Sequence, residues 1–138
     1  MGKYDKYIRA QNEDSRYAIH LGIKTTEIRE GYGKVEVDLV EDHFNPVGSV
    51  HGGLIFSLAD IAAGSASVSY GTGTATVASN LNFVSAAVNS HRLIAEARVI
   101  KRGKKILVID VKVCDDKEKL LATGTFTYYN LGEPFGKE

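Results

Sequence analysis

Cysteine is almost absent from the sequence, and this excludes a disulfide-stabilised domain. The 138 residues include one cysteine, Cys114. No disulfide can therefore form within the chain, as is typical of a protein from the reducing cytoplasm. Cys114 lies in an alternating apolar run, and we expect it to be a small core residue.

Net charge and long membrane-spanning runs are also lacking. Seventeen lysine and arginine residues balance seventeen aspartate and glutamate residues, so no basic field indicates a nucleic acid or an anionic membrane as partner. The polar start, Met1 to Lys6, has no apolar stretch behind it and is not typical of a signal peptide. The uncharged segment 43–91 is too rich in glycine, serine, threonine and asparagine to span a bilayer. We predict a soluble, cytoplasmic protein without a metal or cofactor.

One acidic residue stands alone in the middle of the chain. Asp60 is the only formally charged residue between Asp42 and Arg92, where the average charged content of 25% would place about twelve. Its neighbours, such as Leu58 and Ile61, are apolar. A carboxylate in such a segment costs several kcal/mol unless it is paired, hydrogen-bonded or protonated. Asp60 is therefore either a core acid satisfied by backbone N–H groups or a nearby histidine, or a catalytic group.

Hydrophobic periodicity predicts two strands, one helix and four further strands. The helix, residues 51–70, is apolar all round and should be buried. The remaining segments alternate or are rich in β-branched residues, as strands do; they are residues 20–30, 33–40, 74–86, 93–99, 106–113 and 120–130. We also expect an N-terminal helical extension over 1–16 and a loose tail over 131–138.

This order of elements predicts a single α+β domain over residues 1–138. A curved antiparallel sheet of about six strands wrapped around one buried helix is the economical arrangement. The edges of such a sheet remain open and tend to pair with another copy. We therefore expect a homodimer, with two dimers assembling into a tetramer.

The segment from Asn45 to Asp60 resembles the signature of hotdog-fold acyl-CoA thioesterases of the phenylacetate-pathway type. Asn45 lies in a loop, His51-Gly52-Gly53 opens the predicted helix, and Asp60 follows eight residues after Gly52. The strand order is similar to the hotdog fold over nearly the whole chain. The resemblance implies hydrolysis of acyl-CoA, with Asp60 as general base or as a nucleophile that forms an anhydride.

The two glycines at the start of the helix indicate an oxyanion hole. The first N–H groups of a helix lack intrahelical partners and carry the positive end of its dipole. Without side chains, Gly52 and Gly53 would let a thioester carbonyl approach these donors. The alternative is that the glycines only allow tight packing of the helix start against the sheet.

Gly52 and Asp60 lie too far apart along one helix to act on the same thioester within one chain. Eight residues of helix extend about 12 Å, whereas groups that act on one thioester must converge on the reacting atoms. We therefore expect Gly52 of one subunit and Asp60 of another to share a site, and the resemblance implies the same arrangement at a dimer interface.

The resemblance also suggests roles for other residues. Asn45 resembles the loop amide that positions the attacking water or the acyl group, although it could equally be a turn residue. His51 resembles the histidine that holds the loop and the helix start, and we favour that role over general base. Thr76 lines up with a hydroxyl residue that assists the acid, and Asn80 and Asn82 are competing candidates and possible substrate contacts.

Binding of an acyl-CoA substrate would require positive charge near the phosphates of CoA. Arg102, Lys104 and Lys105 cluster in a turn between two predicted strands, but this cluster could also be an ordinary solvated hairpin tip. Phe56 and its apolar neighbours on the helix could form walls for an aromatic or an aliphatic acyl group.

Two other functions fit the pattern less well. A non-catalytic acyl-CoA-binding module would more naturally lack the acid. A hotdog dehydratase or hydratase needs a catalytic histidine beside an acid, which His51 and Asp60 could mimic.

His43 and His91 lack a partner pattern, and we expect them at the surface.

Overall fold

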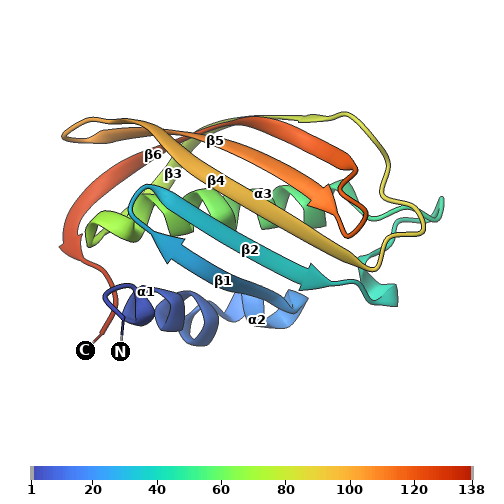
Figure 1. Ribbon diagram of the computed structural model, residues 1–138, viewed down its shortest axis with the longest axis horizontal. Helices are drawn as coiled ribbons and strands as arrows, with labels where there is room; N and C mark the ends of the chain where they lie inside the picture. The colour runs from blue at the N-terminus through green and yellow to red at the C-terminus, as the bar shows by residue number, and fades with distance from the viewer. Residues whose placement is uncertain (1, 138) are drawn as a thin grey trace.

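An antiparallel sheet of six strands curves around one long helix in the computed structural model (Figure 1). The structure describes residues 2–137. The spatial order is β1-β2-β4-β5-β6-β3, and the strands are β1 (Ile23–Arg29), β2 (Tyr32–Asp38), β3 (Thr72–Phe83), β4 (Arg92–Arg102), β5 (Ile106–Asp115) and β6 (Leu120–Pro134). The predicted α+β class and its central helix are confirmed, with strand ends that differ by a few residues.

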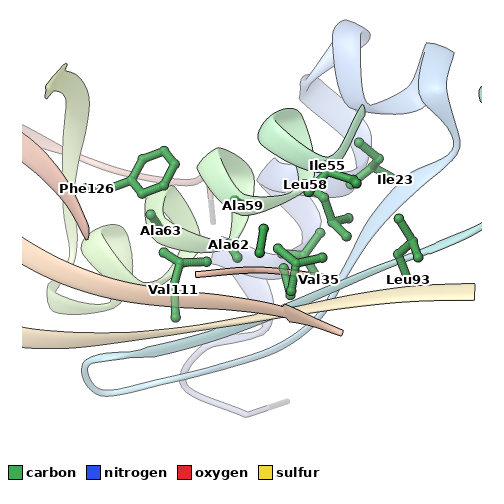
Figure 2. Packing of buried hydrophobic residues seen from close by; sticks show 14 of the residues in the cluster. Ile23, Val35, Ile55, Leu58, Ala59, Ala62, Ala63, Leu93, Val111 and Phe126 are labelled. Carbon is green, nitrogen blue, oxygen red and sulfur yellow. The ribbon is translucent and has the colours of Figure 1, made fainter. Parts of the chain in front are cut away.

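The central helix, α3 (Gly52–Ser67), is buried because its sequence is apolar all round. Leu58, Ala59, Ala62 and Ala63 have no exposed surface, and Figure 2 shows these side chains packed between the helix and the sheet. A short 3-10 turn, η3 (Val68–Tyr70), extends the helix. By length and composition the segment Gly52–Tyr70 could cross a membrane, but 67% of it is buried inside the protein, as expected of a core helix.

The inner face of the sheet packs directly on α3. Every second side chain of β2, β4 and β5 is buried there, including Val35, Val37, Ala95, Ala97, Val111 and Val113. Gly33 on β2 permits a closer approach, since a Cβ at this position would lie 2.7 Å from the backbone nitrogen of Ala66 on α3. The sheet therefore wraps tightly and fixes the position of each residue on α3.

The N-terminal extension is helical further than predicted. It consists of α1 (Asp5–Arg9), a π-helical turn η1 (Ala10–Asp14) and α2 (Arg16–Leu21). The side chain of Ser15 caps α2 at its start, and Gly22 ends it in the left-handed conformation with a φ of 76°. The expected strand over residues 20–30 is therefore shorter at its start, because α2 occupies residues up to Leu21 and β1 begins at Ile23.

The predicted loose tail is wrong over its first residues. β6 continues to Pro134, and the ring of Phe135 lies 6.1 Å from that of Tyr7 in a small apolar cluster with α1. The tail is ordered because this cluster buries Tyr7 and Val68. Residue 138 lies outside the described part of the chain.

Candidate active site

The Asp60 carboxylate is held by two hydroxyl groups from different strands. Asp60 lies in the middle of α3 and is partly buried. Its Oδ1 accepts hydrogen bonds from Thr76 Oγ1 of β3 at 2.9 Å and from Tyr128 Oη of β6 at 2.6 Å. Within residues 2–137, Oδ2 accepts no hydrogen bond. The carboxylate is therefore fixed in orientation, with one oxygen open to react.

Tyr128 is the site residue that the sequence analysis missed. Its side chain is 4% exposed, and its hydroxyl also lies 2.6 Å from the backbone oxygen of Asp60. The pKa of Tyr128 is raised strongly by burial and then by the negative charge and hydrogen bond of Asp60, against a smaller opposite effect of Thr76 and the Gly64 N–H. Tyr128 thus remains a protonated donor to the carboxylate. The only sequence signal was its place on the inward face of an alternating strand.

A β-bulge in β3 determines which side chains face Asp60. The pairing register shifts between Thr76 and Ala78, so that Thr76 lies opposite Tyr128 and Phe83 lies opposite Ala122. Tyr128 and Ala122 are both buried and six residues apart, so Thr76 and Phe83 share the inward face although they are seven residues apart. The expected contact between Thr76 and the acid is present.

Asn80 and Asn82 do not contact Asp60. The expectation that one of them could be its partner in place of Thr76 is therefore wrong. They pair with Thr125 and Thr123 of β6, whose side chains alternate with the buried residues of that strand and therefore face outward. The amide of Asn82 donates to Asn80 Oδ1 at 3.4 Å. The reason is the bulge, which reverses the alternation that the sequence suggests.

The start of α3 leaves one backbone donor open. His51 is the N-cap, and its Nδ1 accepts a hydrogen bond from the Gly53 N–H at 2.8 Å. This contact agrees with the predicted role of His51 in holding the helix start. The Gly52 N–H, in contrast, has no partner within the described chain. Of the two predicted oxyanion donors, only Gly52 is available without breaking an existing hydrogen bond.

An apolar depression of about 370 Å³ lies beside Gly52. Its lining combines the start of α3 with the end of β3 and the loop that follows, including Val50, Ile55, Phe83 and Ala87. A Cβ at Gly52 would lie 3.6 Å from Cε1 of Phe83. An apolar group placed here would therefore bring an attached carbonyl close to the open N–H.

The Asn45 amide is used within its own loop. Its Oδ1 accepts from the N–H groups of Val47 and Ser49, at 3.0 and 3.1 Å, and its Nδ2 donates to Ser49 Oγ at 2.8 Å. These contacts are those of an Asx turn. The structure therefore supports the alternative that Asn45 is a turn residue.

The predicted basic turn lies at the C-terminal end of α3, where Figure 1 shows the β4–β5 hairpin ending. Arg102, Lys104 and Lys105 are exposed. The guanidinium of Arg102 lies 3.9 Å from the centre of the Tyr70 ring, a cation–π contact that orients it. In the strand register, Arg102, Leu107, Tyr128 and Thr76 form one row across the sheet. The turn therefore lies at the same end of the sheet as the partners of Asp60.

Four further residues have expected positions that can be compared with the structure. Phe56 is partly buried, and its ring lies 5.4 Å from that of Phe126 in the core. The surface position expected for His43 is wrong: it is 5% exposed, because Nδ1 accepts from the Val40 N–H at 3.1 Å and Nε2 donates to the Leu21 carbonyl at 2.8 Å. His91 is exposed, as expected. Cys114 is half-buried rather than fully in the core.

Comparison with known proteins identifies the family. Residues 47–122, more than half of the chain, match the thioesterase superfamily. The protein belongs to the thioesterase superfamily. The acyl-coenzyme A thioesterase PaaI of Escherichia coli K12 is 31% identical over 113 residues, which cover 82% of this chain and 81% of that protein. This similarity confirms the predicted class of enzyme, a thioester hydrolase.

Solved structures of other proteins share the fold. The PaaI protein from the E. coli phenylacetic acid degradation operon superimposes with a TM-score of 0.82 at 28% identity, covering 94% of this chain and 97% of that one. The smu.793 protein of Streptococcus mutans UA159, solved with bound acetyl CoA, gives a TM-score of 0.76 at 27% identity and covers 82% and 91% of the two chains. The predicted hotdog fold of the phenylacetate-pathway type is confirmed.

Proposed function

We propose that this thioesterase hydrolyses acyl-CoA at a site formed between two copies of the chain. The observation that carries the proposal is the Asp60 carboxylate, fixed on Oδ1 by Thr76 and Tyr128 while Oδ2 has no partner within residues 2–137. The relative named acyl-coenzyme A thioesterase supports the reaction, and the neighbour with bound acetyl CoA supports the substrate class.

In the proposed reaction, Asp60 and Gly52 act on the same thioester. Asp60 Oδ2 removes a proton from water, whose oxygen attacks the carbonyl carbon. The Gly52 N–H stabilises the oxyanion that develops. The carbon–sulfur bond then breaks, and the CoA sulfur takes up a proton as the free acid leaves. In the covalent alternative, Oδ2 itself attacks the carbonyl and water hydrolyses the resulting anhydride.

The two groups belong to different chains because about 12 Å of helix separates them within one. β3 is an edge strand with mostly exposed residues, so it is open to pairing with a second copy. It carries Thr76, bound to Asp60, near its start, and Phe83, which lies beside Gly52, at its end. Antiparallel pairing of β3 with the β3 of a second copy would bring Thr76 of one chain toward Phe83 of the other.

The same arrangement suggests where the acyl group and the nucleotide of the substrate bind. The acyl group lies in the apolar depression beside Gly52, and the nucleotide of CoA extends toward the exposed basic turn of Arg102, Lys104 and Lys105. Asn45 and His51 hold the loop and the helix start in this scheme. The pairing of two dimers into a tetramer, which we also expect from the sequence, stays a prediction.

Free CoA released from a panel of aliphatic and aromatic acyl-CoA esters tests the proposal. We expect Asp60→Asn to lower kcat at least about a hundredfold, because it removes the base or nucleophile while keeping an oxygen for Tyr128 and Thr76. Near-normal hydrolysis by a folded Asp60→Asn protein, or no CoA release by the unaltered protein, would contradict the proposal.

A substitution at Gly52 tests the oxyanion donor separately. Gly52→Pro removes the N–H while keeping the helix, because proline is well accepted at the first position of a helix. The preceding residue, His51, already has the extended conformation that proline requires, with φ −61° and ψ 134°. We expect kcat to fall about a hundredfold or more. Gly52→Ala keeps the N–H and makes an ordinary contact with Phe83, so it should lose much less.

A further inference from the structure

We propose that Tyr128 is a positioning residue that, together with Thr76, engages Oδ1 of Asp60 and reserves Oδ2 as the reacting oxygen. This inference rests on the proposed function and adds to it a residue and an atom. It starts from the observation that both hydroxyl donors reach the same carboxylate oxygen, at 2.9 and 2.6 Å, rather than one oxygen each.

Burial and two short contacts hold the Tyr128 side chain in this position. Its side chain is 4% exposed, and its hydroxyl lies 2.6 Å from both Oδ1 and the backbone oxygen of Asp60. A donor shared between the side chain and the backbone of one residue restricts rotation of that side chain. Gly64 lies one helical turn beyond Asp60 on α3 and faces Tyr128. A Cβ at Gly64 would lie 3.3 Å from the Tyr128 hydroxyl. The missing side chain leaves room for the contact.

The tyrosine acts through Asp60 and not on the substrate. Its hydroxyl is buried between β6 and α3, and the raised pKa of Tyr128, caused first by burial and then by Asp60, excludes a role as a proton donor that must cycle near neutral pH. Of the two described residues that donate to the Asp60 side chain, Thr76 and Tyr128, only Tyr128 is titratable. Its effect on the reaction is therefore to hold the carboxylate in one orientation.

Tyr128→Phe tests this role, and Tyr32→Phe is the matched control. Tyr32 is 3% exposed, and its hydroxyl also donates to a carboxylate, that of Glu96. Both variants lose a buried hydroxyl bound to an acid, so their stabilities should fall similarly. We expect Tyr128→Phe to lower kcat about tenfold to a hundredfold, as misplacement of a reacting group does, with little change in KM. Tyr32→Phe should keep both constants.

Two readouts separate positioning from a general structural effect. In the Asp60→Asn background, Tyr128→Phe should cause no further loss of the residual activity, because its target is already gone. In the otherwise unaltered protein, the loss should fall on kcat and not on KM, since the carboxylate is displaced while the contacts to substrate are kept. An equal loss in both backgrounds would overturn the proposal.

The outcomes distinguish this inference from the proposed function. If the unaltered protein is active and Asp60→Asn is inactive, but Tyr128→Phe keeps kcat within about twofold, only the role of Tyr128 is overturned. A crystal structure of Tyr128→Phe provides a test that does not depend on activity. We expect a rotated or split Asp60 carboxylate, and an unchanged single orientation would overturn the proposal.

Discussion

Gly64 on α3 and Tyr128 on β6 fit together so closely that a Cβ at Gly64 would lie 3.3 Å from the Tyr128 hydroxyl. The glycine allows the hydroxyl to reach both the backbone oxygen and Oδ1 of Asp60. A residue without a side chain thus determines the contact that orients the proposed catalytic acid.

Gly64→Ala should separate activity from stability. Alanine favours a helix over glycine by about 1 kcal/mol, so we expect the melting temperature to stay the same or rise. The added methyl group displaces the Tyr128 hydroxyl by a few tenths of an ångström, and we expect kcat to fall several-fold. Steady-state kinetics and thermal unfolding measure the two effects.

The control for Gly64→Ala is the same substitution in a Tyr128→Phe protein. Without the hydroxyl there is room for the methyl group, so Gly64→Ala should have no further effect on kcat in that background. An undiminished kcat in the single variant, or an equal loss in both backgrounds, would show that the methyl group does not act through Tyr128.

The basic turn is expected to bind the nucleotide part of the substrate. Replacing Arg102, Lys104 and Lys105 together by alanine should raise KM for acyl-CoA several-fold and leave kcat nearly unchanged, because these exposed charges are expected to contact the nucleotide and not the bond that breaks. The effect should weaken at high salt. Turnover of a short acyl-pantetheine, which lacks the nucleotide, is the control and should not change; equal losses for both substrates would indicate a structural role.

A buried aspartate at the end of β5 should make stability depend on pH. Burial acts to raise the pKa of Asp115, but hydrogen bonds from Ser90 and from the N–H groups of Lys119 and Lys117 outweigh it and lower this pKa below 3.8. The stabilisation is therefore complete above the ordinary pKa and is lost as the pH falls through the lower value of the folded protein.

Asp115→Asn tests this dependence through the free energy of unfolding at pH 7 and pH 3. We expect a loss of about 1–3 kcal/mol at pH 7, typical of hydrogen bonds to a charged group, and a smaller difference from the unaltered protein at pH 3. The exposed Asp42→Asn serves as control and should change little at either pH. An equal difference at both pH values would refute the assignment.

The sequence predicted the features that depend on periodicity and spacing. The apolar pattern of residues 51–70 predicted the buried helix, and the alternating segments predicted a sheet of six strands around it. The spacing from His51 to Asp60 indicated both the helix start and the acid. The family resemblance, and not the spacing, suggested Thr76 as a partner of that acid, with Asn80 and Asn82 as alternatives, and the structure shows the contact with Thr76.

The remaining features depend on contacts that spacing does not encode. A bulge in β3 shifts its alternation, so Asn80 and Asn82 face away from Asp60. Tyr128 reaches the acid from 68 residues away, and only the register between β6 and α3 brings them together. His43 is buried because it bridges the backbone of Val40 and Leu21, and a loop histidine has no periodic pattern that predicts such a role.

Complementation between two inactive variants tests the shared site most directly. Asp60→Asn and Gly52→Pro each damage a different group, and a dimer of one chain of each contains one site with both groups intact. After subunit exchange at equal concentrations, half of the dimers are mixed and each has one of two sites restored. We therefore predict recovery of about one quarter of the specific activity of the unaltered protein. No recovery, with mixed dimers demonstrated by native mass spectrometry, would contradict a site shared between two chains.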